Sequence, residues 1–295
     1  MKPGIYDNMP IEEYHADKRI ISSTGERHAK RSSRDFIQYL ITEQEKMSCF
    51  DFGNAFEIML IDAIQGTLEA QDVIAVFDES KRPLPLQTFG QKDNKQWKID
   101  FEEENKDKYI INRHGEESLD TINEMIHSVL SRPLLKDLLE NVHYQKSIFW
   151  QDEETGLMCK TRPDVSMVNK KVLVNIKTVR DASPEFVARE LRNHDYPLQA
   201  CMEMEGSVQS GYVDKVDFYY WLFVQKSPPY HAELYDFDIQ DIPAVHDKMH
   251  YYLHRCKKAL DQYDETGDIT LVDGFYEDAD NQRGILTADL KYYQP

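Results

Sequence analysis

The chain has 295 residues, enough for one large or two modest domains with a sizeable core at about 150 residues per domain. It is 41% hydrophobic and 30% charged, and no apolar run approaches the roughly 20 residues that a membrane span needs. These values exclude a transmembrane protein. The N-terminus is charged and broken by prolines, unlike a secretory signal, and predicts a cytoplasmic chain with no membrane partner.

Four cysteines, Cys49, Cys159, Cys201 and Cys256, lie far apart in the chain. They form no C-x-x-C pair and no cysteine–histidine cluster at metal-ligand spacing. Neither a disulfide framework nor an iron–sulfur site is indicated. We expect all four to be small, buried, hydrophobic side chains in a reducing compartment.

The formal net charge of -18 opposes binding to nucleic acid. The charge is uneven, however, because basic residues outnumber acidic ones in two segments, 18–34 and 160–192. Two basic islands in an acidic body can confine a polyanion to one groove while the remaining surface repels it. Ordinary solvated charge is an equally good interpretation of each island alone.

The first half of the chain predicts mainly helices. Ser23 and Glu26 match an S-x-x-E capping box that opens a helix running to about residue 40. Apolar residues at helical spacing predict a buried helix over 50–64. Weak signals over 65–114 indicate a variable loop or insertion.

A further helix is expected over 116–140, split by Pro133, before the pattern changes to strands. Residues rich in aromatic and β-branched types predict three consecutive strands that form a meander, with a hairpin turn at Gly156; the strands cover 144–152, 158–168 and 172–179.

Helices return over 183–194 and 196–210, followed by a strand over 216–227. A last helix over 241–263 precedes a peripheral acidic tail, 265–295. This order predicts an α/β fold in which a mixed central β-sheet is flanked by helices. No repeat or flexible linker divides the chain, so we expect a single domain over 1–295.

Chemistry is indicated by the string R-P-D-(x)10-N-I-K, from Arg162 to Lys177. Adjacent strands would bring Asp164 beside Asn175, and strand alternation puts Asn175 and Lys177 on one face. A carboxylate, an amide oxygen and an ammonium would then converge, as in metal-assisted phosphodiester hydrolysis. The spacing by itself favours a surface strand pair with one salt bridge.

Longer sequence segments favour the metal-dependent nuclease site over the surface strand pair. FWQDEETGLMCKTRPD, VLVNIKTVRDASPEFVARE and YPLQACMEME closely resemble the exonuclease VIII (RecE) type of phage and prophage recombination nuclease, in the PD-(D/E)-x-K superfamily. GIYDNMPIEEYHADKRIISSTGERHAKRSSRDF and FGNAFEIMLID also match that family. The resemblance covers residues 4 to about 230 and implies a restriction-endonuclease-like core within a single nuclease domain.

The resemblance implies an enzyme similar to lambda exonuclease. Such an enzyme degrades one strand of linear double-stranded DNA from its 5′ end with Mg²⁺, or with Mn²⁺ in its place. It leaves a 3′ single-stranded overhang for a single-strand annealing protein. The resemblance also implies a ring-shaped homo-oligomer around DNA, in a bacterial host or encoded by a prophage.

On the matched positions, Asp164 and the Ile176 carbonyl would ligate the ion, Lys177 would be the catalytic lysine and Gln199 would contact substrate or water. Asn175 stands where the family has a second metal-binding acid. An amide offers an oxygen but no negative charge.

Two further positions depart from the family's motif. Glu57 stands where the family usually has a histidine, and we expect it to ligate the ion and partly offset Asn175. Glu203 stands where many relatives have a tyrosine four residues after the glutamine, which puts the Gln199 contact in question.

Six basic side chains are expected to bind DNA: Arg27, Lys30, Arg31, Arg34, Arg162 and Arg180. For Arg162 and Arg180, an ion pair with Asp181 or Glu185 fits equally well. Asn175 leaves open a catalytically impaired enzyme or a dead DNA-end-binding or scaffold protein of the same fold. A nuclease of the same fold that works in restriction or spacer acquisition is a further alternative.

Overall fold

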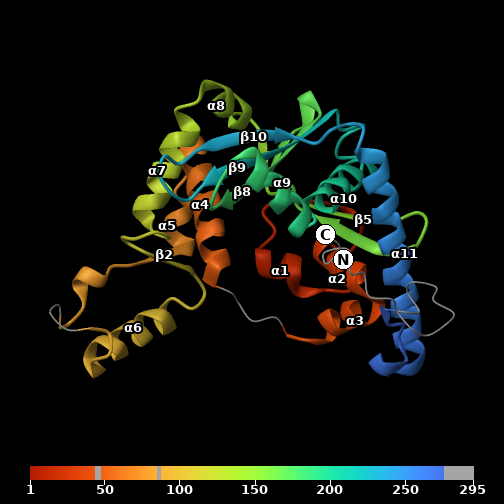
Figure 1. Ribbon diagram of the computed structural model, residues 1–295, viewed down its shortest axis with the longest axis horizontal. Coiled ribbons are helices and arrows are strands. Elements are labelled where there is room, and N and C mark those ends of the chain that lie inside the picture. Colours follow the sequence, from red (N-terminus) through yellow and green to blue (C-terminus); the bar gives the residue numbers. More distant parts are fainter. Residues whose placement is uncertain (44–47, 85–87, 276–295) are drawn as a thin grey trace, which may run out of the picture.

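The computed structural model of the protein describes residues 1–43, 48–84 and 88–275, with only the backbone for residues 48–50 (Figure 1). A five-stranded sheet lies at its centre, in the order β10-β9-β8-β7-β4. Its strands are β4 His143–Tyr144, β7 Val165–Met167, β8 Val172–Val179, β9 Phe218–Gln225 and β10 Ala232–Asp236. Strands β8 and β9 are parallel and the other neighbours antiparallel, so the mixed sheet expected from the sequence is confirmed.

Helices cover both faces of this sheet. Helices α4 Ser48–Gln65, α7 Leu119–Leu130 and α8 Pro133–Leu139 pack on one face. Helices α9 Pro184–Asn193 and α10 Tyr196–Gln209 pack on the other. Successive residues of a strand point to opposite faces, so Val174 joins the first cluster and Leu173 the second. The flanking helices, including the split at Pro133, are as predicted.

The predicted three-stranded meander is wrong. Strands β5 Ser147–Gln151 and β6 Met158–Thr161 pair with β1 Gly4–Tyr6 in a separate antiparallel sheet. The predicted second strand is interrupted between β6 and β7, because Pro163 has no N–H to continue a ladder. The chain passes at that point from one sheet to the other, and Asp164 lies at the break.

The predicted helix from Ser23 to about residue 40 is two helices, α2 Ser23–Arg31 and α3 Ser33–Ile41. Ser32 interrupts it with extended backbone, and its side chain accepts a hydrogen bond from the Asp35 N–H. The predicted capping box is also wrong, because the Glu26 carboxylate is buried and has no hydrogen-bond partner among the described residues. Glu26 lies in the first turn of α2, and Ser22, which precedes the helix, makes no side-chain capping hydrogen bond.

Residues 65–114 have more regular structure than the sequence predicted. They hold α5 Glu69–Val73, β2 Ile74–Phe77, the 3₁₀ turn η1 Glu79–Lys81, α6 Lys92–Glu104 and β3 Tyr109–Asn112. Strands β2 and β3 form a parallel pair, and Phe77 packs against the rings of Trp97 and Phe101 from α6. The apolar residues are sparse and non-local, which explains the weak sequence signal.

Helix α11 Ile242–Thr266 lies along α2, α3 and α10, at the opposite side of the molecule from α6 (Figure 1). The short elements α1 Ile11–Ala16, η2 Val168–Lys170 and η3 Ile269–Leu271 complete the described chain. Most of the predicted acidic tail, from residue 276 on, lies outside the described residues. Cys159, Cys201 and Cys256 are buried as expected, and the side chain of Cys49 is not described. Within the described ranges, no helix is long and apolar enough to cross a bilayer.

Candidate active site

Strands β7 and β8 bring Asp164 to the segment 175–177, as the sequence predicted. Their antiparallel register pairs Val165 with Val174. The Asp164 carboxylate accepts a hydrogen bond from the backbone N–H of Ile176, with Oδ2 and N separated by 2.7 Å. The backbone of β8 therefore fixes one carboxylate at the break between the two sheets.

Asn175 and Lys177 point to the same face of β8, toward α10. The Asn175 amide nitrogen lies 3.2 Å from Glu203 Oε1, and the Lys177 ammonium lies 5.0 Å above the Tyr196 ring. Ile176, between them, joins the apolar cluster on the α4 face. The predicted alternation is confirmed.

Glu57 reaches the same site from α4. Its Oε1 accepts a 2.7 Å hydrogen bond from the Gln145 side chain, while the Gln145 backbone N–H donates to the Asp164 carbonyl. Burial, and next the charge of Asp164, raise the pKa of Glu57, and Lys177 opposes this. Burial likewise raises the pKa of Asp164, against Lys177 and the Ile176 N–H. Two carboxyl groups thus share a site in which a cation would stabilise the ionised forms of both.

A third buried carboxylate, Glu203 from α10, contacts Asn175. Glu203 accepts hydrogen bonds from Asn175 and from Gln199, at 2.8 Å, on Oε1, and from the Tyr219 hydroxyl, also at 2.8 Å, on Oε2. Burial, and next the charge of Asp164, raise the pKa of Glu203 to about 7. The Gln199 amide therefore holds Glu203 in the structure.

The Asn175 carbonyl oxygen has no such partner. Oδ1 is buried and makes no hydrogen bond within the described chain. The opposite amide orientation would turn this oxygen toward the Glu203 carboxylate, which is unfavourable. A buried oxygen without a hydrogen-bond donor is suited to a hard divalent cation.

The predicted DNA-binding arginines differ in the contacts that they make within the protein. Arg162 donates to the carbonyls of Gln145 and Met9, and Arg180 lies over the Phe186 ring. Arg34 donates to the carbonyls of Thr270 and Val272.

The other three basic residues are on α2. Lys30 pairs with Asp195 at 2.5 Å, and Arg27 donates to Thr24 Oγ1. Arg31 lies 3.8 Å from Asp35 with 68% of its side chain exposed, so it is well placed for a ligand.

Several residues at this site were missed by the sequence analysis. Gln145 and Tyr219 carried no local signal, because their partners are distant in the chain.

Glu205, His246 and His250 form a separate group outside this site. The spacing of the two histidines, one helical turn apart, is a signal that the sequence itself carries.

Comparison with known proteins agrees with this fold. Residues 87–268 match the family described as "PDDEXK-like domain of unknown function (DUF3799)". A solved structure described as a "Putative exonuclease" from Eubacterium rectale is similar over 85% of this chain and 87% of its own, with a TM-score of 0.51 and 14% identity.

A structure of SSO0001 has a TM-score of 0.30 and 11% identity over 72% of this chain and 88% of that one. No curated protein gives a significant match. The mixed sheet between two helical layers is a restriction-endonuclease-like fold. The family match covers more than half of the chain, and the protein therefore belongs to the DUF3799 family of PDDEXK-like domains, in the PD-(D/E)-x-K nuclease superfamily.

Proposed function

We propose that the protein is a Mg²⁺-dependent exodeoxyribonuclease that degrades linear double-stranded DNA from 5′ to 3′ and leaves 3′ overhangs for recombination. The observation that carries the proposal is the convergence of Asp164, Glu57 and Lys177 at the β7–β8 site. This site lies largely within the segment that matches the PDDEXK-like family.

The proposed ion, Mg²⁺ or Mn²⁺, would be held by Asp164, Glu57, the Ile176 carbonyl and Asn175 Oδ1. It would supply electrostatic stabilisation to the phosphate at the scissile bond. Lys177 would orient the attacking water and stabilise the negative charge that develops on it, because its ammonium lies on the same strand face as Asn175. Gln199 would act through Glu203, which its amide contacts.

Glu203 would replace the acid that the family carries at position 175. Its carboxylate contacts the Asn175 amide and feels the charges of both Asp164 and Lys177. In this proposal an ionised Glu203 on α10 supplies the negative charge missing from β8, in contact with the same side chain. We expect turnover to survive the asparagine for this reason.

Polarity, recombination and partners rest on the resemblance to exonuclease VIII-type enzymes, and the exonuclease description of the Eubacterium rectale neighbour supports the same class. The proposal includes a ring-shaped homo-oligomer and a single-strand annealing protein as partner. In this arrangement the basic island of α2 would face DNA, with Arg31 as its most exposed member.

The decisive experiment exchanges the acid and the amide between β8 and α10. We expect the unmodified chain to release nucleotides from a linear 5′-phosphorylated duplex in Mg²⁺. Glu203→Gln should lower turnover at least about 10²-fold. Asn175→Asp should give no gain, since it places two carboxylates in contact, and the double variant should recover activity.

Three outcomes would overturn parts of this proposal. A large gain from Asn175→Asp, with no effect of Glu203→Gln, would leave an impaired enzyme of the family's ordinary type. No turnover in any variant, with DNA ends still bound, would favour a DNA-end-binding or scaffold protein, which Asn175 motivates. Nicking of circular DNA would contradict the proposed polarity and the need for an end.

A further inference from the structure

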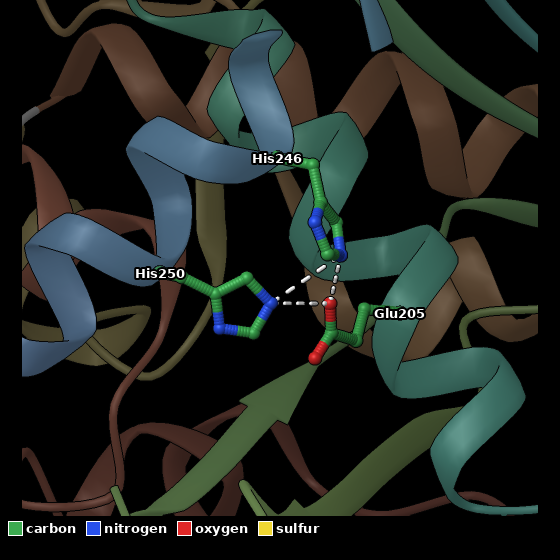
Figure 2. A group of neighbouring side chains, drawn as sticks. All are labelled: Glu205, His246 and His250. Atoms are coloured by element: carbon green, nitrogen blue, oxygen red, sulfur yellow. Dashed lines mark hydrogen bonds and ion pairs between the residues drawn. The ribbon is translucent and has the colours of Figure 1, made fainter. Parts of the chain in front are cut away.

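Two histidines and a glutamate converge between α10 and α11, on a side of α10 different from the one that carries Glu203. His246 and His250 lie one turn apart on α11 and point at Glu205 (Figure 2). Glu205 Oε2 lies 2.5 Å from His246 Nε2 and 3.2 Å from His250 Nε2. The two Nε2 atoms are 3.4 Å apart.

This separation matches a shared metal ion. Two nitrogen ligands at about 2.0–2.1 Å from a tetrahedral ion are about 3.4 Å apart. The Glu205–His246 contact is a hydrogen bond that would lengthen when an ion enters. Two imidazoles and a carboxylate are typical ligands of Zn²⁺ and its transition-metal relatives, whereas Mg²⁺ prefers oxygen alone.

The second nitrogen of His250 faces further acids. Its Nδ1 lies 4.0 Å from Asp152 Oδ1 and 3.7 Å from Glu154 Oε2. His250 Nδ1 and Asp152 Oδ1 are both buried and make no hydrogen bond to any described residue. With Nε2 on a metal, Nδ1 carries the proton and faces these carboxylates, an arrangement that commonly supports a metal-bound histidine.

The surroundings favour a cation. Glu26 is buried nearby with both carboxylate oxygens unpartnered within the described ranges. Burial, and next the charges of Glu205 and Asp152, raise its pKa. A cavity of about 500 Å³, lined in part by Glu205, His246 and His250, gives access to the group. A divalent ion would offset this concentration of acids.

We propose that Glu205, His246 and His250 bind one zinc-class divalent ion that fastens α11 to α10. The site is independent of the proposed nuclease activity, because its ligands lie outside the β7–β8 site. It uses three protein ligands and leaves a fourth position open toward the cavity. Binding to the folded chain alone would raise thermal stability.

Zinc binding by the full chain tests the proposal directly. The protein is stripped with a chelator, and Zn²⁺ is titrated against a chromophoric competitor. We expect one site of micromolar affinity or tighter, and a melting temperature that rises by several degrees with saturating Zn²⁺. His246→Gln/His250→Gln should lose both. His254→Gln, one turn further along α11, is the matched control and should keep both.

Two readouts separate this site from the β7–β8 site. Asp164→Asn should leave the tight Zn²⁺ site intact, and Co²⁺ in place of Zn²⁺ should give visible absorption that only the histidine variants lose. If the double variant is misfolded in chelator by circular dichroism, His246→Gln alone carries the test, since His246 is partly exposed. An unmodified chain without a tight Zn²⁺ site, or histidine variants that keep it, would overturn the proposal.

Discussion

Two faces of α10 carry different chemistry. Toward the sheet, Glu203 contacts Asn175 and lies near Asp164, so every candidate ligand on this side is an oxygen. Toward α11, Glu205 joins the nitrogens of His246 and His250.

The difference shows that the type of ligand depends on which secondary-structure elements hold the side chains. At the sheet, the strand backbone and a break between two sheets hold short carboxylate and amide side chains. Between the helices, two imidazoles from positions one turn apart on α11 meet a carboxylate of α10. The first set suits a hard ion that orients phosphate, and the second a softer ion that links two elements.

The largest effect is expected at Lys177. Lys177→Met should lower the rate of nucleotide release by about 10²–10³-fold, because it removes the ammonium that orients the attacking water and stabilises the charge developing in the transition state. Tight Zn²⁺ binding at the α10–α11 group should not change. The comparison uses Lys170→Met, an exposed lysine on the 3₁₀ turn η2, as control. Equal rates for the two variants would separate Lys177 from the chemistry.

The pH dependence of stability should report on Glu203. The folded-state pKa is about 7, above the ordinary value of 4.5, so the folded protein binds this proton more tightly than the unfolded chain. The contribution is fully present below the ordinary value and is lost as pH rises toward the folded one. In urea unfolding with chelator, the unmodified chain should lose roughly 3 kcal/mol relative to Glu203→Gln between pH 4.5 and 8. Parallel pH profiles would contradict this.

A substitution at Gly206 tests whether both faces of α10 depend on how closely this helix packs against its neighbours. A Cβ at this position would lie 2.5 Å from a ring carbon of the buried Trp150. Gly206→Ala should therefore destabilise the protein by about 1–3 kcal/mol and weaken both nuclease activity and Zn²⁺ binding. Gly25→Ala on α2, where a Cβ meets only ordinary contacts beyond 3.4 Å, is the control. Loss at only one face would show that the two faces move independently.

The smallest effect concerns the basic island. Lys30→Glu/Arg31→Glu should weaken DNA binding most at low salt and reduce the slope of log affinity against log salt by about 2, with neither metal site changed. Lys92→Glu/Lys95→Glu on α6 makes the same charge change away from the site. Equal binding by both variants at every ionic strength would remove α2 from the path of DNA.

Local pattern predicted the elements with strong periodicity and the pairing of β7 with β8. Helix α4, the split at Pro133 and the convergence of Asp164 with residues 175–177 followed from spacing alone. The meander failed because one proline sends two halves of an apparent strand to different sheets. Ser23 was misread because the burial of Glu26 depends on α11, which is more than 200 residues away.

The site shows the same limit. The sequence identified Asn175 and Glu203 as separate departures from the family motif, but only the fold shows that they touch. The sequence also offered little sign of the histidine pair, because both histidines lie in an ordinary amphipathic helix and Glu205 comes from another element. Residues that act together across elements are visible in sequence only when one strand or one turn contains them.

The break at Pro163 makes the candidate nuclease site depend on the N-terminal segment. The Arg162 guanidinium ties the Met9 carbonyl to the Gln145 carbonyl, and Gln145 in turn contacts Glu57. A shift of the small sheet against the large one would therefore displace the carboxylates from one another. The first ten residues are far from the site residues in the sequence. Substitutions among them should nevertheless alter the geometry of the candidate nuclease site.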